Sequence, residues 1–137
     1  MERVFVDTDI VLDLLGCRQP FFPFSAELFS RADKGDLALC ISSLSFANLN
    51  YLLSKQYSSE QARKKLLKFK TLVHVLAVND KIVELSLASD FKDFEDGLQY
   101  FTAIENNITT LLTRNLKDFR VAQIVVMTAE DYLKSKQ

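Results

Sequence analysis

Residues 4–15, VFVDTDIVLDLL, decide the fold that the sequence predicts. The residues Arg3–Asp7 (RVFVD) form a short β-branched and aromatic run, as expected of a buried strand. The apolar residues of Ile10–Leu15 follow at once, at helical spacing. A buried strand that passes directly into a helix is typical of α/β folds, so the rest of the chain can be interpreted from this junction.

The same alternation of strand and helix continues along the chain. Pro20 and Pro23 are predicted to bracket a loop, before a helix that begins near Ala26 and ends near Gly35. Together these patterns predict a single domain over residues 1–137, a three-layer α/β/α sandwich with a central parallel sheet. The further strands are predicted at Leu37–Ile41, Leu72–Val78, Thr109–Thr113 and Ile124–Met127, and the further helices after Ser42–Ser45, after Ser58 or Ser59, at Asp80–Ser89, after Asp90–Asp96 and after Thr128.

The composition predicts a core that needs no covalent cross-links. Hydrophobic residues make up 48% of the chain and eleven residues are Phe, enough for a domain that buries roughly 68% of its unfolded surface. Cys17 and Cys40 lack a CxxC spacing, and His74, the only histidine, is expected to be buried in the third strand. These residues exclude most zinc sites.

The same features indicate where the protein is found. Two isolated cysteines favour a reducing cytoplasm. The first strand begins at Arg3, which leaves no room for a signal peptide. No apolar stretch approaches the roughly 20 residues that span a bilayer, so we expect no membrane partner.

The charge balance limits the classes of ligand. The chain has 17 Lys and Arg against 18 Asp and Glu, a net charge of −1, which argues against a strong non-specific DNA binder. Nucleotide-triphosphate and dinucleotide binding have little support, because no Walker loop and no GxGxxG motif occur.

Phe21 and Phe22 are interpreted as core or interface residues rather than base-stacking platforms. One basic run is either a solvated helix face or an RNA track: Arg63, Lys64, Lys65, Lys68 and Lys70.

Acidic and polar side chains follow the predicted strands, at the edge where parallel sheets bind ligands. Converging carboxylates repel one another unless a cation neutralises them. Oxygen ligands without Cys or His suit Mg²⁺ or Mn²⁺, which could polarise a phosphodiester and activate a water. The residues at this edge are Asp7, Asp9, Asp13, Ser42, Ser43, Asn48, Glu95, Asp96, Thr113, Arg114, Asn115 and Asp118.

Each acid also has a purely structural interpretation. Asp7 could cap the helix that follows it, and Asp96 could be a favourable charge at a helix N-terminus. Asp118 could be a turn residue, and Asp9 could either support the site or cap a helix. Arg114 could bind a phosphate or pair with a neighbouring acid. Three other acids are interpreted mainly as solvated or capping residues: Asp13, Asp93 and Glu95.

Two stretches of the sequence resemble PIN domains. VFVDTDIVLDLL resembles the start of these domains, where an Asp in a D-T-D or D-T-N box ends the first strand. Residues 93–119, DFEDGLQYFTAIENNITTLLTRNLKDF, resemble their later signature: an Asp that opens a helix, a strand, then T-R-N with an Asp three residues on. The resemblance runs from Phe5 to about Leu133, and many relatives are VapC-type toxins, metal-dependent ribonucleases held inactive by an antitoxin.

The resemblance implies a set of site residues. Asp7, Asp96 and Asp118 would bind the metal and carry catalysis, and Thr113 and Asn115 would help to orient the site. Such domains usually carry a Glu on the helix after the second strand, whereas SSLSFANLNYLL (residues 42–53) places Asn48 there. A neutral amide removes one negative charge, and Asp9 is the residue that would substitute for it in part.

Two functions are therefore expected from the resemblance. The first is a Mg²⁺- or Mn²⁺-dependent endoribonuclease acting on RNA, as the toxin of a toxin–antitoxin pair and as a homodimer. The second, suggested by Asn48, is a weakened or inactive PIN domain that binds nucleic acid or a protein partner.

Overall fold

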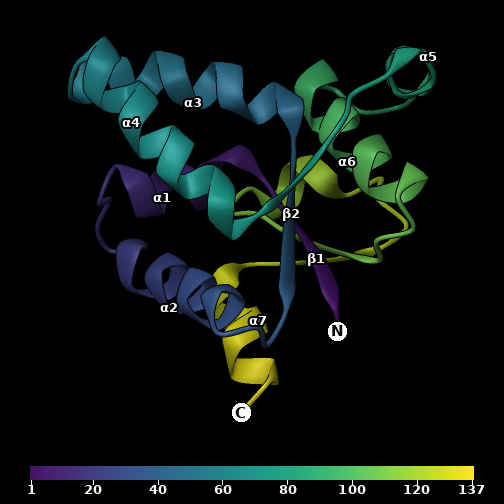
Figure 1. Cartoon of the computed structure of the whole chain (residues 1–137). Helices are drawn as coiled ribbons and strands as arrows, with labels where there is room; N and C mark the ends of the chain where they lie inside the picture. Colours follow the sequence, from purple (N-terminus) through teal and green to yellow (C-terminus); the bar gives the residue numbers. More distant parts are fainter.

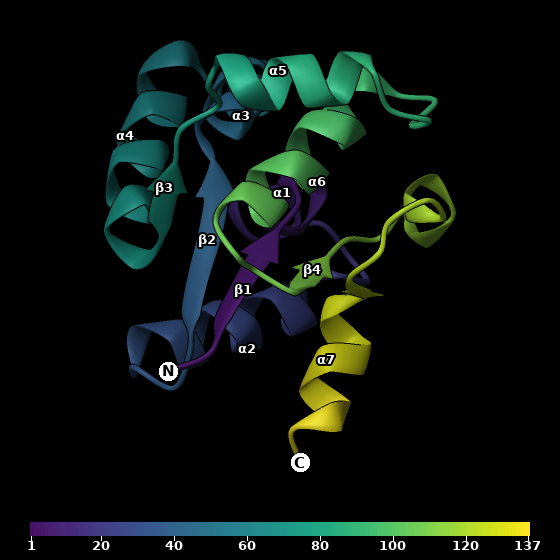
Figure 2. The same ribbon diagram turned by 90° about the vertical axis from the view of Figure 1, so that its right-hand side faces the viewer.

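The computed structural model describes residues 1–137 and is built around a five-stranded parallel sheet in the order β3-β2-β1-β4-β5 (Figures 1 and 2). The strands are β1 (Arg3–Val6), β2 (Ala38–Ser42), β3 (His74–Leu76), β4 (Thr110–Leu112) and β5 (Val125–Met127). The helices are α1 (Thr8–Leu15), α2 (Phe22–Asp33), α3 (Ser43–Gln56), α4 (Ser59–Phe69), α5 (Asp80–Leu87), α6 (Phe94–Glu105) and α7 (Ala129–Ser135), with 3₁₀ turns η1 (Lys70–Leu72) and η2 (Leu116–Phe119).

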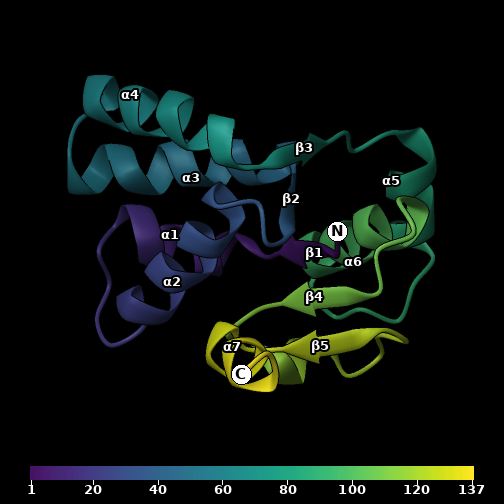
Figure 3. The same ribbon diagram turned by 60° about the horizontal axis from the view of Figure 1, so that its bottom comes forward.

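The sheet has a hydrophobic core on each face, because alternate side chains of a strand point to opposite sides. Val4 and Val6 of β1 pack with residues from α1, α2, α3, α4 and α7. Phe5, between them, packs on the other face with Tyr100 of α6 and Phe119 of η2. Figure 3 shows α1–α4 and α6 on opposite sides of β1 and β2. The predicted three-layer α/β/α sandwich with a central parallel sheet is therefore confirmed.

The third strand differs most from the sequence prediction. Only His74–Leu76 is a strand, and Leu72 belongs to the preceding 3₁₀ turn. β3 lies at the edge of the sheet and pairs with β2 alone, so its outer side has no partner strand. The expectation that His74 is buried is wrong, because this side chain is exposed.

The loop predicted around Pro20 and Pro23 is shorter than expected. Helix α2 begins at Phe22, so Pro23 lies in its first turn. Proline is tolerated there because the first N–H groups of a helix have no partner within the helix.

None of the seven helices combines the length and the apolar character that a membrane-spanning helix needs.

The strand order places a topological switch between β1 and β4. Successive strands extend from β1 towards β3 on one side and from β4 to β5 on the other. At such a point the loops leave the sheet in opposite directions, and a crevice forms at the carboxyl ends of the strands. Val6 is in register with Leu112, so Asp7 and Thr113 are the first residues beyond the paired strands.

Candidate metal centre

Asp7 is held rigidly where β1 passes into α1. One carboxylate oxygen accepts a hydrogen bond of 2.7 Å from the backbone N–H of Thr8, which makes Asp7 the N-cap of α1. The other oxygen accepts a hydrogen bond of 2.9 Å from the Thr113 hydroxyl at the end of β4. The cap interpretation is correct, and it leaves Asp7 at the predicted edge of the sheet.

Asp9 is bound by the segment that follows β4. Its Oδ2 accepts hydrogen bonds from the Arg114 backbone N–H at 3.0 Å, the Thr113 hydroxyl at 3.3 Å and the Asn115 side-chain amide at 3.4 Å. Its Oδ1 is buried without a hydrogen-bond partner. Asp9 therefore ties the first βα junction to the Thr113–Asn115 segment and keeps one carboxylate oxygen unpaired.

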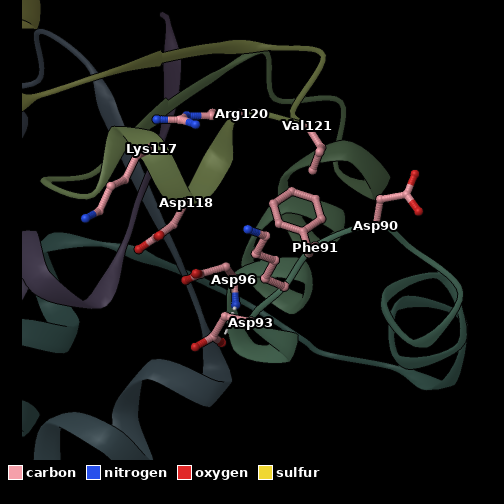
Figure 4. Close-up of a pocket in the computed structure, with 9 residues that line it drawn as sticks. Asp90, Phe91, Asp93, Asp96, Lys117, Asp118, Arg120 and Val121 are labelled. Carbon is pink, nitrogen blue, oxygen red and sulfur yellow. Dashed lines mark hydrogen bonds between the residues drawn. The ribbon is translucent and has the colours of Figure 1, made fainter.

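Two adjoining cavities bring together the acids that the sequence places far apart. The first, of about 330 Å³, is lined by residues from four separate segments of the chain: Asp7, Thr8, Asp9, Leu12, Asn48, Tyr51, Leu52, Glu95, Asp96, Gln99 and Asn115. The second, of about 520 Å³, includes Asp96 again, with Asp118, Asp93, Lys92, Lys117 and Arg120. Figure 4 shows the Asp96 and Asp118 side chains pointing to the same side of this cavity. Asp96 thus belongs to both cavities, and Asp118 only to the second.

Burial and mutual repulsion disfavour the charged forms of the two central acids. Burial raises the pKa of Asp7 to about 7, and the neighbouring charge of Asp9 adds to the rise. Burial also raises the pKa of Asp96 to about 7, together with the charges of Asp93 and Asp118. A cation placed among these carboxylates would reverse this effect, since it favours their ionised forms.

The donor set fits a hard divalent cation. Every candidate ligand offers oxygen, and the buried Asp9 Oδ1 lacks any partner. As the side chains stand, no three Asp, Glu, His or Cys residues are close enough together to hold one ion. This arrangement suits Mg²⁺, which typically uses one or two carboxylates and keeps several waters.

Asn48 faces the cavity from α3, at the position where the resemblance led us to expect a Glu. Its side-chain amide donates a hydrogen bond of 3.3 Å to Glu95 Oε2 on α6. Glu95 is exposed, as expected, but it also lines the cavity. Asp93 accepts hydrogen bonds from the backbone N–H groups of Glu95 and Asp96, so its interpretation as a capping residue is correct.

Gln99 is a buried residue of the cavity that the sequence analysis did not identify. Its side-chain amide donates hydrogen bonds to Thr8 Oγ1 at 3.2 Å and to Ser45 Oγ at 2.9 Å. It therefore links α6 to α1 and α3 behind the acids. Gln99 lies three residues after Asp96, on the same face of the helix, and that spacing could have indicated it.

The Arg114 side chain points away from the acidic cavity. Its Nε donates a hydrogen bond of 2.8 Å to Asp13, whose side chain is only 1% exposed, and its guanidinium carbon lies 4.2 Å from the centre of the Phe21 ring. The ion-pair interpretation of Arg114 is therefore correct. The interpretation of Asp13 as a solvated or capping residue is wrong. Phe21 is 38% exposed and serves as a platform for Arg114.

Replacing Arg114 by Met should destabilise the fold by about 2–3 kcal/mol. Removing one partner of a buried pair costs about 3–5 kcal/mol, and the cost is lower here because the Arg114 side chain is 28% exposed. Urea denaturation measures the change. The control Arg31→Met breaks an ion pair with Glu27 on the surface of α2 and should cost less than about 1 kcal/mol. Equal effects of the two substitutions would contradict the importance of the Asp13 pair.

Comparisons with known proteins agree with this architecture. A family model for the PIN domain matches residues 3–117. Ribonuclease VapC1 of Aquifex aeolicus (strain VF5) is 29% identical, over 96% of this chain and 93% of that protein. VapC20 of Mycobacterium tuberculosis, a toxin that cleaves the sarcin–ricin loop, has a similar structure. The two structures align with a TM-score of 0.69 at 17% sequence identity, over 89% of this chain and 96% of that one. VapBC2 of Rickettsia felis, solved with a DNA fragment from its promoter, gives a TM-score of 0.66 at 22% identity, over 91% of this chain and 96% of that one.

Proposed function

This chain belongs to the PIN domain family, and on that premise we propose that it is a divalent-metal-dependent endoribonuclease. One observation carries the proposal: Asp96, which is distant in the sequence, lines the same cavity as Asp7 and Asp9, at the carboxyl ends of β1 and β4. The relation to a curated ribonuclease supports the same class of reaction. The chemistry of the donor set favours Mg²⁺ or Mn²⁺.

In this proposal each side chain has a defined task. Asp7 and Asp96 would hold the ion directly, and Asp118, in the second cavity, would contribute through a water. Thr113 orients Asp7 by donating to Oδ2. Asn48 and Asn115 offer neutral oxygens to the ion or its waters. The bound metal would polarise a phosphodiester oxygen and lower the pKa of a water.

Cleavage of RNA in the presence and absence of metal tests the proposal. We expect the purified chain to cleave a mixture of single-stranded RNAs with Mn²⁺ or Mg²⁺. Excess EDTA should stop the reaction, because the acids cannot stabilise a phosphodiester without a cation. The control is a second addition of Mn²⁺ in excess of the EDTA, which should restore cleavage. Cleavage that continues at the same rate in EDTA would refute a metal-dependent site.

We further propose that the chain is the toxin of a toxin–antitoxin pair, acting in the cytoplasm. Similar solved structures include a toxin–antitoxin complex from Klebsiella pneumoniae, with a TM-score of 0.68 at 21% identity, over 92% of this chain and 97% of that one. An antitoxin partner and a homodimer are therefore part of the proposal. Growth arrest on expression, relieved by the product of an adjacent small gene, would support it, and normal growth with active enzyme would count against it.

A weakened, non-nucleolytic PIN domain is the second candidate function. Asn48 in place of a carboxylate and the separation of Asp118 from Asp7 favour it. Such a protein would bind RNA with Mn²⁺ and leave it uncut. If it bound neither RNA nor Mn²⁺, a role in protein interaction would remain.

A further inference from the structure

Tyr51 presents an aromatic ring at the edge of the acidic cavity. It lies on α3, three residues after Asn48, and lines the same cavity as Asp7 and Asp96. Its side chain is 58% exposed. The Lys55 ammonium lies 4.2 Å from the ring centre, one helical turn further along α3. A large aromatic ring is thus held beside the acids without a structural role in the core.

Tyr51 differs from Tyr57, the residue that follows α3, in exposure and in hydrogen bonding. Tyr57 also has a lysine over its ring, Lys65 at 4.5 Å. Unlike Tyr51, however, Tyr57 is half-buried, and its hydroxyl donates to the Leu15 carbonyl. Tyr57 therefore joins α3 to α1, whereas the contact given for the Tyr51 ring is the one with the Lys55 ammonium.

Both cavities are acidic overall, and a few cations lie among or beside their acids. The first cavity is lined by acids, and Lys55 supplies a cation beside it. The second cavity, which shares Asp96 with the first, contains Lys92, Lys117 and Arg120 together with Asp90, Asp93 and Asp118 (Figure 4). An RNA strand that runs past Asp96 from one cavity to the other would meet a cation beside the first and cations within the second, and its phosphates could contact them. Proteins that bind single strands combine such cations with aromatic rings on which the bases stack.

We propose that Tyr51 is the platform on which a nucleobase of single-stranded RNA stacks, beside the phosphodiester that is cleaved. Lys55 then contacts a phosphate of the same strand. This inference rests on the proposed function and adds the residues that hold the RNA beside the acids. The bases of a duplex are already stacked and cannot lie against the ring, so single strands are preferred.

Binding without cleavage provides the test. The Asp96→Asn variant, with Mn²⁺, is titrated with a fluorescently labelled single-stranded RNA, alone and combined with each substitution. Tyr51→Ala should weaken binding about tenfold, because one base loses its stacking partner. Tyr51→Phe keeps the ring and should bind as before. Lys55→Gln should weaken binding and reduce the salt dependence by about one phosphate contact.

Two controls separate this role from general effects. Leu67→Ala removes an exposed apolar side chain from α4, away from both cavities, and should leave binding unchanged. A duplex of the same sequence should bind at least about tenfold more weakly than the single strand. Equal binding of the duplex, or an effect of Leu67→Ala equal to that of Tyr51→Ala, would overturn the inference.

Kinetics of the protein with Asp96 intact distinguish a failure of this inference from a failure of the proposed function. Tyr51→Ala should raise KM about tenfold and leave kcat within about twofold, since the ring holds the RNA and does not contact the reacting atoms. If the protein cleaves RNA and Tyr51→Ala changes neither KM nor binding, the stacking role is wrong and the nuclease stands. If the protein never cleaves but binding depends on Tyr51, the nuclease is wrong and the stacking role stands.

Discussion

Asp96→Asn is expected to lower the rate of Mn²⁺-dependent RNA cleavage by at least about 100-fold. Asp96 is shared by both cavities, so every proposed path of the RNA passes it. An amide in place of the carboxylate binds the metal ion more weakly. The charge of the ion stabilises the transition state by several kcal/mol, and each 1.36 kcal/mol changes the rate about tenfold. Single-turnover cleavage at saturating RNA measures the loss.

The fold should survive this substitution. The Asp96 carboxylate is destabilised by burial and by the charges of Asp93 and Asp118, which together raise its pKa to about 7. An uncharged Asn of the same shape removes that repulsion, so the free energy of unfolding without metal at pH 8 should not fall. Urea denaturation of the variant shows whether it is still folded, and therefore whether a loss of cleavage is catalytic.

Asp93→Asn is the matched control on the same helix. Asp93 caps α6, a task that Asn performs equally well, and it lines only the second cavity. Cleavage should stay within about threefold of the original rate. Should Asp96→Asn cleave as fast as Asp93→Asn, the metal must bind elsewhere.

The sheet and the place of the site could be predicted because both depend on local patterns. The strand before Asp7 is short and β-branched, and parallel strands collect ligands at their carboxyl ends. The alternation that sends Val4 and Phe5 to opposite faces follows from the geometry of any strand. These rules therefore place Asp7 and Thr113 at one edge, and the structure brings Asp96 to the same cavity as Asp7.

The wrong predictions share one cause, since burial depends on partners distant in the sequence. The apolar neighbours of His74 predict a buried side chain. His74 is nevertheless exposed, because β3 lies at the edge of the sheet and has only one partner strand. Asp13 was interpreted as a solvated or capping residue. Local sequence could not reveal its burial, because its partner Arg114 follows another strand. A periodic pattern indicates which side chains share a face, but it does not identify what covers that face.

Without divalent metal, the stability of the fold is expected to fall as the pH rises from about 4 to 7. The pKa of Asp7 is raised from 3.8 to about 7 by burial, with a contribution from Asp9. Below pH 4 Asp7 is protonated in both the folded and the unfolded chain, so its neutral form imposes no penalty. Between pH 4 and 7 the unfolded chain releases the proton while the folded chain keeps it, which favours unfolding. A difference of about 3 pKa units corresponds to about 4 kcal/mol, lost in full above pH 7.

The Asp7→Asn variant isolates this contribution, because the amide cannot titrate and its oxygen can still cap α1. Urea denaturation in EDTA at pH 5 and pH 8 should show a smaller loss of stability for Asp7→Asn than for the original chain. Asp33→Asn, at the exposed end of α2, should leave the original pH dependence unchanged. Millimolar Mn²⁺ should flatten the dependence in the original chain alone, since an ion that binds the carboxylate stabilises the folded state most where the carboxylate is charged. If the stability of Asp7→Asn and of the original chain depended on pH in the same way, burial of Asp7 would not destabilise its charged form. The electrostatic reason for a cation at this edge of the sheet would then be lost.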